Sequence, residues 1–289
     1  MKMLTSIVTR LNRLHDWAIE RPYLGVLVRA TDSGLEHQSK DSAAAIAYYT
    51  LLSLFPLILG LISIGGYFLT SSEIQLWMND LIVKLLPVSA EFVTQNIDSL
   101  VRIRGAAGIT SVVVLMWSAS KVIGALSRAI NCSLGMKRNF AVYLSPFRYF
   151  GLTLIIALLA LVTLAISPTA ELLSELKLDV LGSKWNMALD IITNRGVGYM
   201  TTGILVSALY ILLPYRRLPW RDLLPGLLVA IALIETGKML FIWYVETAAN
   251  YSAVYGSLSS IIVLLIWVYF SARVVLLGAE IIGVIRTDK

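Results

Sequence analysis

The chain has 289 residues, a net charge of +6, a 57% share of hydrophobic residues and a mean hydropathy of +0.77. Soluble domains are about 45–50% apolar, so this composition excludes an ordinary water-soluble domain and predicts a protein whose main solvent is lipid. Cys132 is the single cysteine of the chain, which excludes an internal disulfide.

Six apolar stretches are long enough to cross a hydrocarbon core of about 30 Å, which takes about 17 or more helical residues. We therefore predict an all-α membrane protein with six transmembrane helices in one transmembrane domain, 43–285, which follows an N-terminal segment, 1–42, and precedes a short tail, 286–289. No cleaved signal is expected, because about 40 polar and amphipathic residues precede the first span. The predicted spans are 43–69, 106–127, 149–168, 197–213, 223–245 and 257–281.

The positive charges predict the orientation. If both termini lie on one side of the membrane, that side carries 15 Lys and Arg residues and the other carries six. Short cytoplasmic loops hold the excess of Lys and Arg, so both termini are expected in the cytoplasm. This distribution, with attraction to anionic headgroups, accounts for most of the net charge, and no nucleic-acid partner is expected.

Amphipathic stretches precede and separate the spans. Residues 3–20 and 22–38 carry apolar residues at helical spacing among charges. They predict cytoplasmic amphipathic helices in segment 1–42, which either lie on the inner membrane surface or pack as a hairpin on the bundle. The same periodicity in residues 70–105 and 169–196 predicts interfacial or re-entrant helices in the two larger external loops.

The first span contains a proline, Pro56, well inside its apolar run. Proline removes one backbone hydrogen bond and clashes with the preceding turn, so a kink is expected there. Broken helices are common where transporters bind substrate or flex, which makes Tyr48, Tyr49 and Ser53, together with Pro56, candidate gating and cavity residues. A purely structural proline is an equally weighted alternative.

Two tryptophans, Trp117 in the second span and Trp267 in the sixth, lie in mid-span rather than at an interface. Tryptophan is normally enriched at the two membrane–water interfaces. These two side chains are candidates to line a cavity, although bulky packing is the interpretation that the sequence favours.

The fifth span holds two opposite charges, Glu235 and Lys238, in an otherwise apolar run. At this spacing the two residues lie about 60° apart on a helix and can interact. Near mid-bilayer a charge costs about 2.5–3.5 kcal/mol on insertion scales, so it normally faces a partner or a water-filled cavity. We therefore predict either a substrate or ion pathway, or a neutralised pair that fixes helix packing.

Three more ionisable residues lie within spans: Lys121 in the second, and Arg273 and Glu280 in the sixth. Arg273 and Glu280 are seven residues apart and share a helix face. With Glu235 and Lys238 these residues are predicted to surround an anionic or zwitterionic group in a cavity open toward the inner leaflet. The alternatives are snorkelling of the two cations to the inner headgroups and capping or surface exposure of Glu280.

Enzyme chemistry has little support in the sequence. The only histidines are His15 and His37, and no His, Cys, Asp or Glu cluster has metal-ligand spacing. The tripeptide at 236–238 resembles the end of a phosphate-binding loop, but Ala232 stands where that motif requires glycine. We therefore expect no catalytic residue, no metal site and no cofactor. The protein is not expected to be an enzyme.

Four separated motifs, in order, resemble the YihY/BrkB family of bacterial inner-membrane proteins over about residues 43–285. The motifs read AAAIAYYTLLSLFPLILGLISIGGYF, LMWSASKVIGALSRAIN, LYILLPYRRLPWRDLLPGLLVA and YGSLSSIIVLLIWVYFSARVVLLGAEI. The residues that map onto the family's motifs are Tyr48, Tyr49, Ser53, Pro56, Trp117, Ser118, Asn131, Pro214, Pro225, Gly226, Tyr255, Gly256, Trp267, Gly278, Ala279 and Glu280.

The resemblance implies a six-helix inner-membrane protein with both ends cytoplasmic. For members of the family it also implies export or transbilayer movement of lipids and small amphipathic molecules. Ile281 and Ile282 replace the small asparagine usual after the last motif, which weakens a role carried over to that end. Members have also been labelled ribonuclease BN; that label conflicts with the isolated acids among cations on the predicted cytoplasmic side, since nucleolytic cleavage needs metal-binding carboxylates or acid–base pairs.

The first functional hypothesis is therefore a transporter or flippase-like protein that moves a lipid or small amphipathic substrate. The alternative is a membrane scaffold that recruits envelope-assembly proteins through its external loops and uses the buried charges only to hold helices together. A membrane-bound nuclease is the least favoured. The expected partners are membrane lipids, the small substrate, and an envelope protein or a second copy of the chain.

Overall fold

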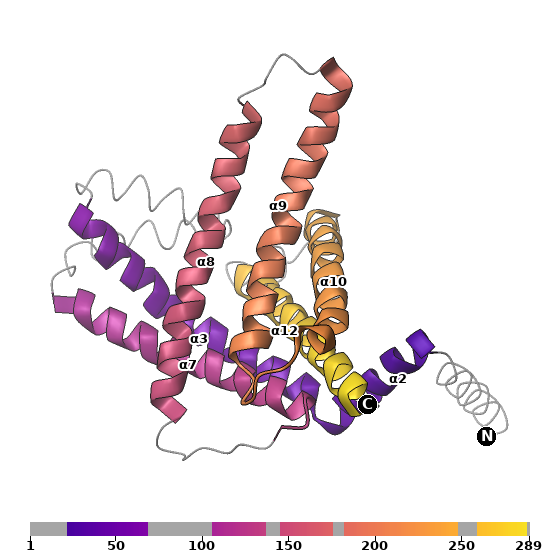
Figure 1. The fold of residues 1–289 in the computed structure, drawn as a ribbon. Helices are drawn as coiled ribbons and strands as arrows, with labels where there is room; N and C mark the ends of the chain where they lie inside the picture. The colour runs from indigo at the N-terminus through magenta and orange to yellow at the C-terminus, as the bar shows by residue number, and fades with distance from the viewer. Residues whose placement is uncertain (1–21, 69–105, 137–144, 176–181, 248–258, 288–289) are drawn as a thin grey trace.

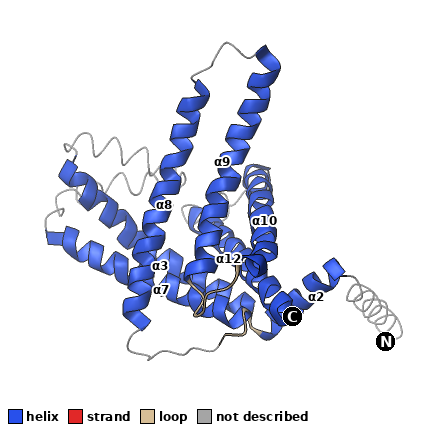
Figure 2. Ribbon diagram, viewed as in Figure 1, coloured by secondary structure: helices blue, strands red, loops and turns tan. Residues whose placement is uncertain are grey.

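The structure is a computed structural model that describes residues 22–68, 106–136, 145–175, 182–247 and 259–287. In this part of the chain it contains seven α-helices and no strand (Figure 2), which confirms the predicted all-α class. The helices are α2 (Pro22–Glu36), α3 (Ser39–Phe68), α7 (Ala106–Ser133), α8 (Ser145–Glu175), α9 (Gly182–Leu212), α10 (Trp220–Thr247) and α12 (Ser259–Thr287).

Each predicted span lies in one helix, in the order α3, α7, α8, α9, α10 and α12, apart from Leu213, which follows α9, and end residues outside the described part. Among the described residues, three stretches are long and apolar enough to cross a membrane: Val113–Ser133, Trp220–Val245 and Ile261–Thr287. Shorter apolar stretches, Phe147–Ala160 and Gly196–Leu212, lie in α8 and α9. The length and apolar composition of these stretches are those expected of a membrane protein.

The structure of residues 169–196, predicted to form the second external loop, differs from the expected interfacial helix. Residues 169–175 continue α8 and residues 182–196 belong to α9, so the described part of this loop contains no separate interfacial helix. Each of these helices has 31 residues and is roughly 46 Å long. The helical periodicity of this segment therefore comes from the ends of α8 and α9, and both helices are longer than the hydrocarbon core is thick. Residues 3–20 and 70–105 lie outside the described residues.

The helices pack in pairs (Figure 1). Helix α3 lies beside α7, and α8 lies beside α9, while α10 packs on both α9 and α12. Helix α12 also contacts α2, α3 and α7. Of the two alternatives for residues 22–38, the structure therefore shows packing on the bundle, because α2 lies against α12 and α3.

The buried core gathers at one end of the bundle. Its residues come from the start of α3, the second half of α7, the end of α9, the first half of α10 and the second half of α12. On the predicted topology this is the cytoplasmic end. The expected cavity open toward the inner leaflet is therefore not found in the described part of the chain, where this end is the most closely packed.

Away from this end the helices diverge (Figure 1) and carry exposed large apolar side chains. In a membrane such side chains face lipid or neighbouring helices at no hydrophobic penalty. These residues include Val113 and Val114 of α7, Leu154, Leu158 and Val162 of α8, Met200 of α9, Leu240 and Trp243 of α10, and Ile266 of α12.

Local signals fix the ends of two helices at the packed end. After α7, Gly135 adopts a φ of 65°, its N–H donates to the Cys132 carbonyl, and the Met136 N–H donates to the Asn131 carbonyl. This pair of bonds is a Schellman motif, in which glycine takes the left-handed position. Between α2 and α3, Gln38 takes a φ of 51°, so the chain turns there, and both helices contact α12.

Candidate functional sites: two buried carboxylates

Glu235 is held by two partners between α9 and α10. The Lys238 ammonium donates to Oε1 of Glu235 at 2.6 Å and to the Thr202 hydroxyl at 2.9 Å. The Thr202 hydroxyl in turn donates to the same Oε1 of Glu235. Thr202 and Glu235 are each 7% exposed, whereas the Lys238 side chain is 38% exposed. The predicted pair therefore forms, and a hydroxyl from another helix completes it.

The pair lies deep in an apolar helix. Glu235 follows Trp220 by 15 residues, or roughly 22 Å along α10. A methyl group added to Gly198 of α9 would lie 3.4 Å from Oε2 of Glu235, so a larger residue at this position would press on the carboxylate. A glycine one turn before Thr202 thus leaves room for the acid to face α9.

Helix α12 packs on the other side of α10 in the antiparallel direction. Ala230 of α10 faces Gly278, while Gly237 faces Phe270. This register places Glu235 level with residues 272–273 of α12. Trp267 of α12 is half-buried, with its ring centroid 5.0 Å from that of Phe241 and 5.8 Å from that of Phe270, so its ring packs between other aromatic side chains.

Lys121 and Trp117 lie together on the outside of α7. The Lys121 ammonium sits 4.9 Å from the centroid of the Trp117 ring, and both side chains are exposed. A cation over an aromatic face is attracted by the quadrupole of the ring. Trp117 therefore serves as a surface partner of Lys121 rather than as packing inside the bundle.

Arg273 is half-buried in α12 at the level of Glu235. Within the described part of the chain it has no hydrogen bond or ion pair. The structure thus gives Arg273 a depth shared with the Glu235 pair, but no contact with it.

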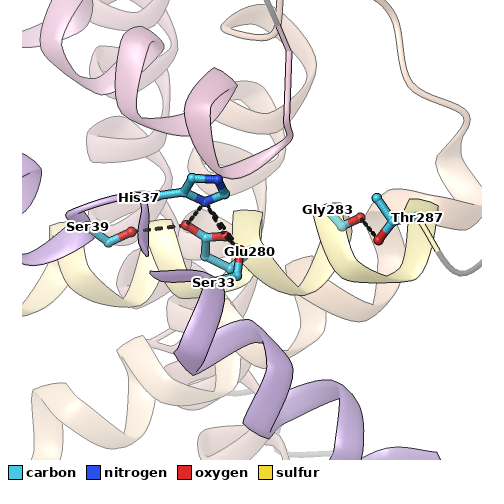
Figure 3. Close-up of polar contacts among 6 residues, drawn as sticks. All are labelled: Ser33, His37, Ser39, Glu280, Gly283 and Thr287. Carbon is cyan, nitrogen blue, oxygen red and sulfur yellow. Dashed lines mark hydrogen bonds and ion pairs between the residues drawn. The ribbon is translucent and has the colours of Figure 1, made fainter. Parts of the chain in front are cut away.

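The second carboxylate, Glu280, lies near the end of α12 and is 1% exposed. Figure 3 shows it enclosed by side chains from α2, α3 and the turn between them. The Ser33 hydroxyl donates to Oε2 at 2.7 Å, and the Ser39 hydroxyl donates to Oε1 at 3.1 Å. Nδ1 of His37 lies 3.0 Å from Oε2 and 3.1 Å from Oε1.

The five predicted charges therefore occupy separate places. Glu235 and Lys238 form one site, Glu280 forms another with residues of the N-terminal segment, and Lys121 pairs with Trp117 on the surface. Neither surface exposure nor helix capping describes the surroundings of Glu280.

The candidate gating residues lie in α3, which runs through Pro56 as one helix. The Ser53 hydroxyl donates to the Thr50 carbonyl at 2.7 Å, within its own helix. The rings of Tyr48 and Tyr49 lie 5.7 Å apart; Tyr48 is exposed and Tyr49 packs against the core. Neither of these contacts reaches the two carboxylate sites.

A polar clamp joins α7 and α8 to the α9–α10 joint, residues 213–219. Asn131 donates to the Leu213 carbonyl at 3.0 Å and accepts the Tyr215 N–H at 2.7 Å. Arg148 of α8 donates to the carbonyls of Leu213 and Pro214, at 3.2 and 3.1 Å. The clamp satisfies backbone groups that the end of α9 leaves open.

Sequence reasoning missed Thr202, Ser33 and Ser39 as partners of the carboxylates, and it treated His37 only as part of an amphipathic stretch. The polar residues within apolar helices were visible, but which ones meet was not. Among described residues, no group of three or more His, Cys, Asp and Glu side chains could hold a metal ion.

The described residues also form an open groove of about 560 Å³ between α8 and α9. Its lining is almost wholly apolar and contains none of the five predicted charges. The lining residues are Leu159, Met200, Gly203, Ile204, Ser207, Ala208, Ile211 and Leu212.

A protein-family model described as Virulence factor BrkB matches residues 31–289. The chain belongs to this family. The match includes both carboxylate sites of this BrkB-family protein, since Ser33, His37 and Ser39 lie within it.

Similar proteins match most of the length of the chain. YfkH of Bacillus subtilis (strain 168), named as a ribonuclease-like protein, is 30% identical over 256 residues, which cover 88% of this chain and 92% of the relative. A UPF0761 membrane protein of Alkalilimnicola ehrlichii is 30% identical over 242 residues, covering 83% of this chain and 53% of the relative. A UPF0761 membrane protein of Glaesserella parasuis is 27% identical over 200 residues, 69% of each chain. No solved structure matches the chain.

Proposed function

We propose that this BrkB-family protein is a multi-pass protein of the bacterial inner membrane. The proposed spans are α3, α7, α8, α9, α10 and α12, with both termini in the cytoplasm. Support comes from the charge distribution of the loops and from the apolar stretches within these helices. The packed end, which contains Glu280 and the α9–α10 joint, is then the cytoplasmic end.

We further propose that the protein moves a lipid or small amphipathic molecule with an anionic or zwitterionic head group. One observation carries this proposal: a Glu235–Lys238 pair lies deep in an apolar helix and keeps part of its cation exposed. An ammonium has three donors, and two of them are used by Glu235 and Thr202 in the described residues. A head group that passes the pair can accept a hydrogen bond from the third donor.

In the proposed mechanism Lys238 draws the head group along α10 while Glu235 balances the charge of the empty site. With the proposed orientation the packed end lies on the cytoplasmic side, so in this mechanism the substrate reaches the pair from the diverging ends of the helices. Lys121 and Arg273 lie on other faces at similar distances from the packed end, and they act as secondary attractions for the same head group.

Transbilayer movement of labelled anionic and zwitterionic phospholipids in proteoliposomes tests this proposal. Wild-type protein is expected to move lipid above the background of empty vesicles, and Glu235→Gln should move less, because Lys238 is then an uncompensated charge. The double variant Glu235→Gln/Lys238→Gln lacks the ammonium that draws the head group and should also move less lipid than the wild type. Thr236→Val, at an exposed position of α10, is the matched control and should move lipid as the wild type does.

Full activity of both Glu235→Gln and Lys238→Gln, at normal abundance, would remove the pair from the pathway. Movement of neither lipid, under any ion gradient, would favour the scaffold alternative. In that case a stoichiometric envelope partner, lost on deletion of residues 70–105, should be recovered by cross-linking.

We propose no catalytic residue for this protein. The ribonuclease-like name belongs to the Bacillus subtilis relative. Incubation of purified protein with RNA, with and without divalent cations, tests the point: RNA should stay intact. Degradation that a single substitution abolishes would reverse this proposal.

A further inference from the structure

The open groove of about 560 Å³ lies between α8 and α9 (Figure 1), apart from the Glu235–Lys238 pair. Its lining includes Met200 and Ile204 of α9. Each is two residues from Thr202, which donates to Glu235. Two residues along an α-helix turn a side chain by about 200°. The groove therefore lies on the face of α9 that points away from the pair, and the proposed mechanism does not use it.

The length of the groove matches one leaflet of a bilayer. Its lining on α9 extends from Met200 to Leu212, which is roughly 18 Å along the helix axis. The hydrocarbon core of a bilayer is about 30 Å thick, so one leaflet contributes about 15 Å. A transmembrane helix of a second copy would pack over the whole thickness, whereas the acyl chain of a lipid extends through one leaflet only. The length of the groove thus favours an acyl chain.

Small side chains keep the groove open. Gly203, Ser207 and Ala208 belong to its lining. In a membrane such an apolar hollow gains nothing from the hydrophobic effect when protein replaces lipid, since lipid tails are as apolar as leucine. The groove alone therefore selects no particular lipid, and any selection must come from the head group.

Two arginines follow the end of the groove at Leu212. Arg216 and Arg217 belong to the joint 213–219, and both are exposed. Within the described part of the chain, neither has a hydrogen bond or an ion pair. The next acid along the chain, Asp222, is buried. The polar clamp fixes the backbone of the joint, so these two free cations stay close to the end of the groove.

The rest of this region is also positive. Arg148 of α8 donates to the carbonyls of Leu213 and Pro214 in the joint. Neither the part of α8 before Glu171 nor residues 196–219 contain an acid. Clusters of Lys and Arg beside a transmembrane helix on the cytoplasmic side attract anionic lipids. With the proposed orientation this end of the groove lies at the inner head groups, so its charge fits an anionic phospholipid of the inner leaflet.

We propose that an anionic phospholipid binds this protein with an acyl chain in the α8–α9 groove and its phosphate at Arg216 and Arg217. The lipid fills the space between the two helices and joins them to the charged joint. It is a resident lipid and not the transported molecule, because its chain lies on the face of α9 opposite to Glu235 and Lys238. The choice of the inner leaflet rests on the proposed orientation, whereas the binding itself does not.

Native mass spectrometry of the full-length protein tests this site, because it counts bound lipids and protein copies together. Delipidated protein in detergent is titrated with phosphatidylglycerol, which is anionic, and separately with zwitterionic phosphatidylcholine. Wild type is expected to retain a phosphatidylglycerol molecule at concentrations at which it retains no phosphatidylcholine. Arg216→Gln/Arg217→Gln should weaken this binding about thirtyfold, or about fivefold for each arginine. Arg286→Gln removes an exposed cation at the same end of the bundle and should bind as the wild type does.

A second pair of variants tests the groove. Ser207→Phe places a ring in it and should weaken the binding about tenfold, within the range for an overpacked site. Leu154→Phe adds the same ring at an exposed position of α8, about 140° around the helix from Leu159, and should change nothing. Equal binding of the two lipids, or binding that neither the arginine variant nor Ser207→Phe weakens, would overturn the proposal. So would a lipid-free dimer that Ser207→Phe dissociates, since a second copy would then occupy the groove.

Three results separate this inference from the proposed transport. Lys238→Gln alters the pair and should still retain phosphatidylglycerol; its loss there would place the lipid in the pathway and overturn the resident site. Retained phosphatidylglycerol without any lipid movement in proteoliposomes contradicts the transport function and leaves this site standing. Lipid movement by wild-type protein that retains no phosphatidylglycerol overturns the site and leaves transport standing.

Discussion

Gly226 of α10 and Gly278 of α12 lie backbone against backbone. A methyl group added to Gly278 would lie 2.8 Å from the carbonyl oxygen of Gly226 and 3.1 Å from Cβ of Ala230. Small residues allow membrane helices to approach this closely. The contact fixes the antiparallel register of α10 and α12, and through it the level at which Glu235 lies.

Substitution of Gly278 by alanine should therefore destabilise the bundle. The added methyl group would also displace the Tyr210 hydroxyl from its place beside Gly278, and overpacking of this kind costs about 1–3 kcal/mol. The free energy of unfolding, measured in detergent by denaturant titration, should fall by that amount. Gly151→Ala in α8, where a methyl group meets nothing within 4 Å, is the control. Equal stability of the two variants would contradict the close approach.

Thr202→Val tests the hydroxyl that joins α9 to the Glu235–Lys238 pair. Valine has the shape of threonine but neither donates to Glu235 nor accepts from Lys238, so part of a buried ionic contact is left unsatisfied. We expect a loss of about 1–3 kcal/mol in the free energy of unfolding and reduced lipid movement. Thr236→Val, one residue after Glu235 and exposed, should change neither. A harmless Thr202→Val would mean that the pair needs no partner from α9.

The sequence predicted this pair only in part. Two opposite charges three residues apart in an apolar helix must meet, because their spacing alone places them together. Thr202 lies 33 residues before Glu235, and no periodic signal links a hydroxyl on one helix to a carboxylate on the next. Such a partner depends on the rotation of both helices about their axes.

The fold, like this pair, was predicted only in part from the sequence. Apolar runs predicted where the six helices lie, because a helix in lipid must be apolar over its length. The lengths of α8 and α9 were not predicted, since their polar ends read as separate interfacial helices. The burial of Glu280 was not predicted either: His37 and Glu280 are 243 residues apart, and their contact depends on how α2 folds back on α12.

The clamp at the α9–α10 joint makes a further prediction. Asn131 is 1% exposed and donates to the carbonyls of Ser127 and Leu213. Asn131→Asp keeps the shape but places a carboxylate against these two acceptors. The free energy of unfolding should fall by about 3 kcal/mol or more, the range for an uncompensated buried charge.

A nearby serine provides the control for this variant. The Ser133 hydroxyl is buried and has no hydrogen-bond partner in the described part of the chain. Ser133→Ala should therefore leave stability unchanged or raise it by up to about 1 kcal/mol, because an unsatisfied buried hydroxyl is removed. If Asn131→Asp were as stable as Ser133→Ala, the clamp would contribute little to the packed end.

The single cysteine offers a direct test of the orientation. Cys132 is exposed and lies at the end of α7 near the clamp, at the end of the bundle proposed to face the cytoplasm. A membrane-impermeant maleimide added to intact spheroplasts should therefore leave it unlabelled, and permeabilised membranes should be labelled. The Cys132→Ser variant should give no labelling in either preparation.

Single cysteines introduced into the Cys132→Ser variant test which residues lie on the opposite side of the membrane. Lys177→Cys, in the loop predicted to be external, should react in intact spheroplasts, whereas Arg216→Cys, at an exposed position of the α9–α10 joint, should react only after permeabilisation. The reverse labelling pattern would mean that the protein has the opposite orientation in the membrane. Glu280 and His37 would then lie at the outer end of the bundle, and the packed end would close it toward the outer compartment.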